Sequence, residues 1–271
     1  MSDSMPDPGK ARYLRHRAAV GAYGRALTGA ERSTRGNRHL AFVMAFVAGA
    51  INAVGFVAVA IYTSHMTGMT ASVSDHIAVG EWRLIIPPGT AIVSFILGAA
   101  STAILFNWMR RRETAGRFAV VLVLESLLIL LFGLLADSLD AVGAEILIVG
   151  ILGYVMGLQN ALITKVSGAR IRTTHVTGMV TDIGIELGKA LYRNRRPDTP
   201  PVVHDPVKLL LLTTMVSLFA VGGVVGALGY IWIGYETVIP FAMVLLAAGT
   251  LPVLDDIRRT RRAAPGPRVA G

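Results

Sequence analysis

The chain has 271 residues, of which 53% are hydrophobic and only 16% are charged, whereas a soluble domain has about 25% charged residues. Its formal net charge is +9, but the basic residues lie in short clusters between apolar runs, so we expect no nucleic-acid partner. There is no cysteine, which excludes disulfides, thiolate metal sites and a cysteine nucleophile.

The first segment, residues 1–39, is polar and rich in arginine, and it lacks the apolar core of a cleavable signal peptide. We interpret it as a basic cytoplasmic tail. Within it, residues 11–30 either form a helix on an anionic membrane surface or stay unstructured. Residues 258–271 form a second basic tail. Anionic lipid is therefore an expected partner of both tails.

A membrane-spanning helix needs about 20 mostly apolar residues. Connectors rich in Arg and Lys alternate along the chain with connectors that have one or none. Because basic connectors stay in the cytoplasm, the sequence predicts an all-α polytopic membrane protein with both termini cytoplasmic. The six predicted transmembrane helices lie at residues 40–62, 85–109, 118–136, 146–163, 207–232 and 238–254.

Two motifs occur twice in the chain. Gly-x-x-Asn-Ala occupies residues 49–53 and 157–161, and His-x-Thr-Gly-Met occupies residues 65–69 and 175–179. The copies are 108 and 110 residues apart, and two further matches follow later in each half in the same order. Chance matches would not stay collinear, so the chain contains an internal repeat.

Each half, residues 40–136 and 143–257, holds three predicted spans. Because three is odd, the second copy must insert upside down relative to the first. Such inverted repeats recur in secondary transporters, where the substrate site lies between the repeats near the bilayer midplane. The alternative is that duplication only produced a stable bundle, in which small residues such as Gly98 and Gly222 allow close helix packing.

Each His-x-Thr-Gly segment precedes a short helix-like stretch, at residues 69–80 and 179–192. The threonine would cap that helix, and the glycine after it would allow close approach. A helix N-terminus suits anions. The alternative is that Thr-Gly only turns the chain at the membrane surface. The predicted substrate-binding residues of these segments are His65, Thr67, Gly68, His175, Thr177 and Gly178.

Polar amides inside two predicted spans form the second candidate. Asn52 and Asn160 recur in the two halves, and Gln159 stands beside the second. Polar groups in hydrocarbon need partners, so each amide either holds neighbouring helices together or faces a site. The recurrence favours a substrate-binding role for all three.

Glu125 lies within the third predicted span, and its repeat counterpart is Ala248. An intramembrane carboxylate favours a functional role, and we predict proton coupling; the alternative is a structural glutamate that is protonated or paired with arginine. Asp182 and Glu186 lie one turn apart on the second short stretch, and we interpret them as part of a solvated helix face.

The chain has no motif of a serine hydrolase, a zinc protease or a phosphate-binding loop. Ser64 and Ser167 are the serines close to the paired motifs, and neither has an evident base. The two motif histidines lack nearby cysteines or paired carboxylates, which disfavours a metal site. We therefore predict no enzymatic activity, no cofactor and no metal.

The segments AGAINAVGFVAVAIYTSHMTGMTASVSDHIAVGEW and MGLQNALITKVSGARIRTTHVTGMVTDIGIELGKAL resemble the YoaK-like family of uncharacterised bacterial membrane proteins (domain of unknown function 1275). The resemblance covers about residues 38–257 and implies a six-span inner-membrane protein, without implying a function. The chain departs from the family pattern at Asn52, where the family usually has Asp, and at Met69, where it usually has Asn. A proton or cation held by that Asp would be lost or altered here.

These observations predict a secondary transporter or exporter of a small solute, with an anion as one candidate class and access alternating between the halves. The alternative is a non-transporting scaffold or sensor whose basic tails bind a partner or anionic lipid. The transporter hypothesis predicts that the candidate residues, including Glu125, approach one central cavity. An oligomer is compatible with either function.

Overall fold

The computed structural model describes residues 34–112, 117–141, 144–166, 173–195 and 199–263, and all regular elements in these ranges are helices. Residues 11–30, where a surface helix was one interpretation, lie outside them. The helices in chain order are α2 (Thr34–Val59), α3 (Met66–Ala78), α4 (Ile86–Arg111), α5 (Arg117–Ala141), α6 (Glu145–Val166), α7 (Val176–Leu191), α8 (Pro206–Ile233) and α9 (Val238–Ala263). Two 3₁₀ turns, η1 (Trp82–Ile85) and η2 (Gly234–Thr237), precede α4 and α9.

Five helical segments are long and apolar enough to span a membrane, which confirms an all-helical chain with several candidate spans. They are Arg38–Val59, Trp82–Arg111, Phe118–Asp140, Glu145–Val166 and Pro206–Thr250. The last segment has 45 residues and includes α8, η2 and the first part of α9. The sixth predicted span, residues 238–254, therefore begins inside the fifth segment.

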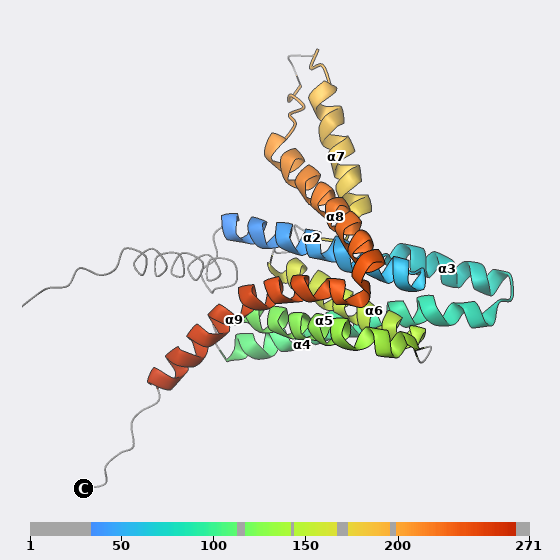
Figure 1. The fold of residues 1–271 in the computed structure, drawn as a ribbon. Helices are drawn as coiled ribbons and strands as arrows, with labels where there is room; N and C mark the ends of the chain where they lie inside the picture. The colour runs from blue at the N-terminus through green and yellow to red at the C-terminus, as the bar shows by residue number, and fades with distance from the viewer. Residues whose placement is uncertain (1–33, 113–116, 142–143, 167–172, 196–198, 264–271) are drawn as a thin grey trace, which may run out of the picture.

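The turn between α8 and α9 is formed by η2. Gly234 has a φ of 68°, a left-handed conformation that favours glycine, and its N–H donates to the Tyr230 carbonyl at the end of α8. Figure 1 shows that the chain changes direction here and that α9 then runs along α5, against which it packs. The long apolar segment is thus two helices with different packing partners.

The bundle is built from three helix pairs, α2 with α8, α4 with α6, and α5 with α9. Glycines set the closest approach in the first two pairs. Gly49 on α2 faces the Phe219 carbonyl on α8, and Gly157 on α6 faces the Phe95 carbonyl on α4. A Cβ atom at either glycine would overlap that carbonyl oxygen, so both contacts require the smallest residue.

The second long helix of each half supplies matching glycines to the same pairs. Gly222 and Gly226 on α8 lie against the backbone of Phe46 and Ala50, and Gly98 on α4 lies against that of Tyr154. This confirms close packing by the small residues. In both pairs, the first long helix of one half packs on the second long helix of the other half.

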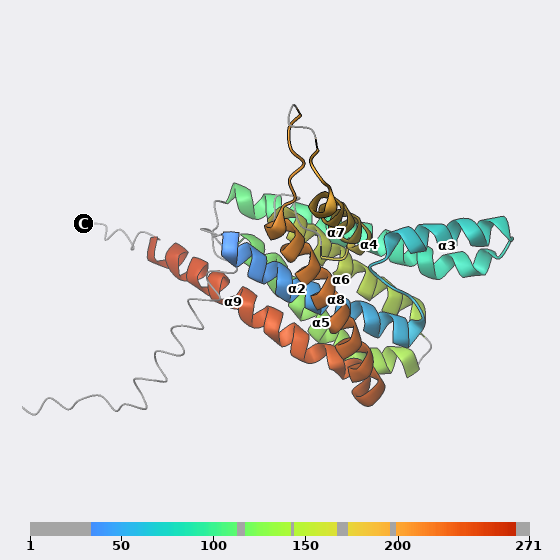
Figure 2. The same ribbon diagram turned by 90° about the horizontal axis from the view of Figure 1, so that it is seen from above.

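Two helical hairpins extend from the bundle. Figures 1 and 2 both show α3 beside the first part of α4, projecting from one side of the molecule. The α7 helix lies beside α8 and projects in another direction (Figure 1). None of the α3 residues is buried, whereas α7 buries Met179 and Glu186. We call these two hairpins the first arm, α3–α4, and the second arm, α7–α8.

Candidate functional site

One cavity of about 770 Å³ lies where the two arms join the bundle. Its size falls within the range of about 300–1,000 Å³ that is usual for small-molecule sites. Both halves of the chain contribute to its wall. The lining residues are Asn52, Tyr62, Ser64, His65, Met66, Thr67, Phe95, Ala99, Asn160, Ala161, Thr164, Lys165, Thr174, His175, Val176, Thr177 and Phe219.

Most of the polar wall consists of repeat-related pairs. The amide pair is Asn52 with Asn160, and each His-x-Thr segment contributes its histidine and its threonine. An aromatic side chain from the second long helix of each half completes the pairing, with Phe95 and Phe219 in matching positions. The structure therefore brings six of the predicted residues to one cavity: Asn52, His65, Thr67, Asn160, His175 and Thr177.

The asparagines tie the long helices to the residues just before the motif histidines. Asn52 Oδ1 accepts hydrogen bonds from the Ser64 hydroxyl at 2.8 Å and the Ser64 N–H at 3.1 Å. Asn160 Oδ1 accepts one from the Thr174 hydroxyl at 2.7 Å. Since Ser64 and Thr174 are 110 residues apart, as the histidines are, the bond from a hydroxyl to the asparagine recurs in both halves.

Each motif histidine stands immediately before a helix. His65 and His175 are the N-cap residues of α3 and α7, and neither side chain hydrogen-bonds the helix that it precedes. The prediction that the threonines cap these helices is therefore wrong, because Thr67 and Thr177 lie one residue inside the first turn. The imidazole occupies the space that a side chain on the glycine would fill.

The two motif glycines do not line the cavity but position the rings that do. A Cβ atom at Gly68 would overlap the His65 ring, and one at Gly178 would overlap the His175 ring. Glycine thus lets each imidazole lie against the first turn of its helix. The sequence predicts that another group approaches these glycines closely. In the structure that group is the protein's own histidine ring.

The wall is asymmetric at the end of α6. Lys165 and Thr164 on α6 line the cavity, whereas the positions 108 residues earlier hold Val57 and Phe56. The exposed Lys165 ammonium lies 5.8 Å from the Phe106 ring centroid. No aspartate or glutamate is among the lining residues in the described part of the chain. Among the described lining residues, the cavity therefore has one lysine or arginine side chain and no acidic one.

Gln159 and Glu125 lie away from this cavity. Gln159 is fully buried on α6 and donates from Nε2 to the Met44 carbonyl at 3.3 Å, which fits a contact between α6 and α2. Glu125 is fully buried on α5, and neither carboxyl oxygen has a hydrogen-bond partner within the described ranges. The expectation that Glu125 approaches the cavity is therefore wrong.

Sequence reasoning missed several lining residues. Ser64 and Thr174 directly precede the paired histidines, so the repeat itself could have indicated them. Phe95 and Phe219 belong to the later matches between the halves, 124 residues apart, so the repeat could have indicated them too. The sequence did not indicate Lys165 as a lining residue. A lysine at the cytoplasmic end of an apolar helix is common whether or not it lines a site.

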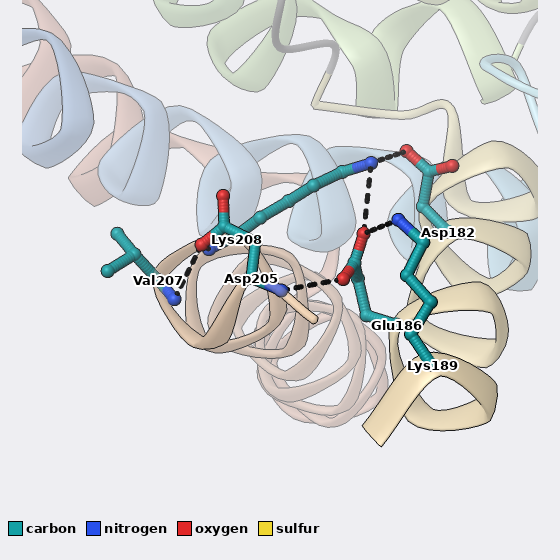
Figure 3. Close-up of polar contacts among 6 residues, drawn as sticks. All are labelled: Asp182, Glu186, Lys189, Asp205, Val207 and Lys208. Carbon is teal, nitrogen blue, oxygen red and sulfur yellow. Dashed lines mark hydrogen bonds and ion pairs between the residues drawn. The ribbon is translucent and has the colours of Figure 1, made fainter. Parts of the chain in front are cut away.

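The acidic residues on α7 form an ion-pair cluster with α8 (Figure 3). The Glu186 side chain is only 2% exposed and accepts from Lys189 Nζ at 2.9 Å and from the Asp205 N–H at 2.8 Å. Lys208 lies 3.1 Å from Asp182 and 3.9 Å from Glu186. The interpretation of Glu186 as part of a solvated face is therefore wrong.

This cluster changes the acidity of its central carboxylate. The N–H of Asp205 and the ammonium of Lys189, helped by the charge of Lys208, hold the pKa of Glu186 below its ordinary value. Asp205 also caps α8, since its carboxylate accepts from the N–H groups of Val207 and Lys208, both at 3.0 Å. The cluster thus fixes the start of α8 against α7.

The fold and the cavity define an α-helical protein with several candidate membrane spans and a cavity lined by residues from both halves of the chain. The family model "Protein of unknown function (DUF1275)" matches residues 40–251, and the chain belongs to this family. This confirms the resemblance at the level of the family. No curated protein and no solved structure matches the chain.

Proposed function

We propose that this protein is a secondary transporter or exporter of a small solute, which binds in the cavity shared by the two halves. The single observation that carries the proposal is the composition of the wall. Residues 110 positions apart, such as His65 and His175, line the same small-molecule-sized space. A binding site formed jointly by two related units is the arrangement on which alternating access depends.

The proposal treats the two halves as inverted repeats with three spans each. Its support is the cross-packing of the glycines: Gly49 lies on Phe219 in one pair, and Gly157 lies on Phe95 in the other. Gly49 corresponds to Gly157 and Phe219 corresponds to Phe95, so a twofold rotation that interchanges the halves would place each contact on the other. A helix rises about 1.5 Å per residue, so the 45-residue segment is about twice as long as a bilayer core and suits two crossings.

We further propose that the protein lies in the bacterial inner membrane with both termini cytoplasmic. The alternation of basic and non-basic connectors supports this orientation. Under the same proposal, the basic tails contact anionic lipid. The Lys165 end of α6 then faces the cytoplasm.

Glu125 is the proposed proton-coupling residue. Its support is the burial of a carboxyl with no hydrogen-bond partner in the described part of α5 and its neighbours. Such a group in an apolar interior is expensive to retain and is often functional. Because it lies away from the cavity, it would act on helix packing and not on the solute directly.

The alternative function is a scaffold or sensor that does not transport. A packed interior without a polar cavity would favour it, and the cavity instead favours transport. An enzyme is disfavoured by the surroundings of Ser64, whose hydroxyl donates to an amide oxygen and not to a base. Neither alternative explains why the lining residues occur in pairs.

Uptake by purified protein in proteoliposomes tests the proposal. The probe is a ¹³C-labelled pool of small bacterial metabolites, and mass spectrometry identifies the solutes that accumulate above the level in empty liposomes. We expect at least one solute to accumulate, and its flux to fall in Asn52→Ala and Thr177→Ala. Accumulation of no solute, or a flux unchanged in both variants, would contradict the proposed function.

A further inference from the structure

The two cavity asparagines are oriented by different hydrogen bonds. Asn52 is 7% exposed, and its Oδ1 atom accepts from both the N–H and the hydroxyl of Ser64. A backbone N–H can only donate, so the atom that faces it must be the amide oxygen. The orientation of the Asn52 amide is thereby fixed, and its NH₂ group is the end left for other partners.

The NH₂ groups of the two asparagines differ in what they contact. Asn160 Nδ2 donates to the Met156 carbonyl at 2.8 Å, and its oxygen is occupied by Thr174. Asn52 Nδ2 forms no hydrogen bond with any described residue, although the side chain is more than nine-tenths buried and lines the cavity. Because most of this side chain is buried, the cavity is the place where the NH₂ group can find an acceptor.

Further donors and positive charge lie around the same cavity. The first residues of α3 and α7, Met66 and Val176, line it, and neither helix has a side-chain cap for its N–H groups. Both helices therefore place the positive end of a dipole at the cavity wall. Lys165 adds a full positive charge, and none of the described lining residues bears a negative one.

We infer that the cavity binds a small solute with an anionic oxygen group, and that the Asn52 NH₂ is the donor that determines this specificity. The inference rests on the proposed function, since it names the substrate class of the same cavity. Ser64 acts as a positioning residue, because its two hydrogen bonds turn the NH₂ toward the solute. Asn160 supports the wall and does not donate to the solute.

The substitution Asn52→Asp tests the role of this NH₂ directly. The aspartate retains an oxygen for both Ser64 hydrogen bonds, so the local fold is kept. The other end changes from a donor to a negatively charged acceptor, which repels an anion. The matched control is Asn194→Asp, because Asn194 bonds Val202 through both ends of its amide and lies outside the cavity.

Binding is measured by isothermal titration calorimetry on the full-length protein in detergent. The anionic probes are phosphate, lactate and citrate, and the other probes are choline and glycerol. We expect at least one anion to bind, Asn52→Asp to weaken its binding by at least tenfold, Lys165→Gln to weaken it several-fold, and Asn194→Asp to leave it unchanged. Size-exclusion chromatography and thermal unfolding show that each variant is folded.

Binding of choline or glycerol without binding of any anion would overturn the inference, as would equal anion affinity in the wild type and Asn52→Asp. Failure of every anion to bind would overturn it too. The same probes in proteoliposomes separate it from the proposed function. Binding without flux retains the anion site and contradicts transport, whereas flux of choline or glycerol alone retains transport and contradicts the anion site.

Discussion

The two arms begin alike and end differently. At the cavity, α3 and α7 each start after a histidine whose ring lies against a glycine one turn into the helix. Away from the cavity, the buried Glu186 pairs with Lys189 and Lys208 and holds α7 against α8, whereas α3 buries no residue. The two arms are thus alike where they meet the cavity and differ where they point outward.

The glycine contacts between helices give the largest expected effect, and they should be equally sensitive in the two halves. Gly49→Leu and Gly157→Leu each force a side chain into a facing carbonyl group. Overpacking of this kind destabilises by about 1–3 kcal/mol and sometimes more. We expect both variants to lower the thermal unfolding temperature in detergent or to abolish the monodisperse species.

The same substitution at Gly184 is the control for this experiment. Gly184 lies on α7, and a Cβ atom there would meet nothing within 4 Å. Gly184→Leu should therefore leave the unfolding temperature nearly unchanged. Destabilisation by only one of the two buried substitutions would break the symmetry inferred for the helix pairs.

The ion-pair cluster should make the arms differ in local stability. Glu186→Ala removes the acceptor for Lys189 and for the Asp205 N–H, so the second arm should open more often. We expect trypsin to cleave after Arg193 several-fold faster at neutral pH. Asp75→Ala on the first arm should not change this rate, and an unchanged rate in Glu186→Ala would show that the cluster does not hold the arm.

The cluster also predicts a pH dependence. Because its partners hold the pKa of Glu186 below the ordinary glutamate value, its contribution is fully present above that ordinary value. The contribution is lost as the pH falls through the lowered pKa. Amide hydrogen exchange around residues 186–194 should accelerate, beyond the intrinsic rate, only at acidic pH. Extra exchange beginning near neutral pH would contradict this assignment.

Changing the glycines beside the two histidine rings should have a smaller effect, which falls on flux and not on stability. Gly68→Ala and Gly178→Ala should turn the adjacent histidine ring, because a ring can rotate away from a methyl group more cheaply than a carbonyl can move. We expect a several-fold loss of flux with little change in unfolding temperature. In the double variant that also contains His65→Ala, Gly68→Ala should have no further effect, and an additive loss would contradict the contact.

The smallest expected effect concerns the bond from Thr174 to Asn160. Thr174→Val keeps the shape of the side chain but removes the hydroxyl, which donates to Asn160 Oδ1 at 2.7 Å. A hydrogen bond of this kind contributes about 1 kcal/mol, or about 2–4 °C in unfolding temperature for a chain of this size. Ser64→Ala should cost less, since the Ser64 N–H still donates to Asn52.

The helices could be predicted from the sequence because apolar length and basic connectors report directly on membrane insertion. The cavity pairs could be predicted because a repeat marks the same position twice, as at Asn52 and Asn160. The capping of α3 could not, because an N-cap depends on the backbone dihedral angles of one residue, here His65. The environment of Glu186 depends on Asp205, which folds back from a loop 19 residues later.

The formation of one cavity by both halves can be measured directly, because the chain contains no native cysteine. Thr67→Cys and Thr177→Cys are each labelled with a membrane-impermeant thiol reagent in right-side-out and inside-out vesicles. We expect both cysteines to react from the same side under a given condition, and the favoured side to change when transported solute is added. Reaction of Thr67→Cys from one side only and of Thr177→Cys from the opposite side only, with or without solute, would show two separate loops and contradict the shared cavity.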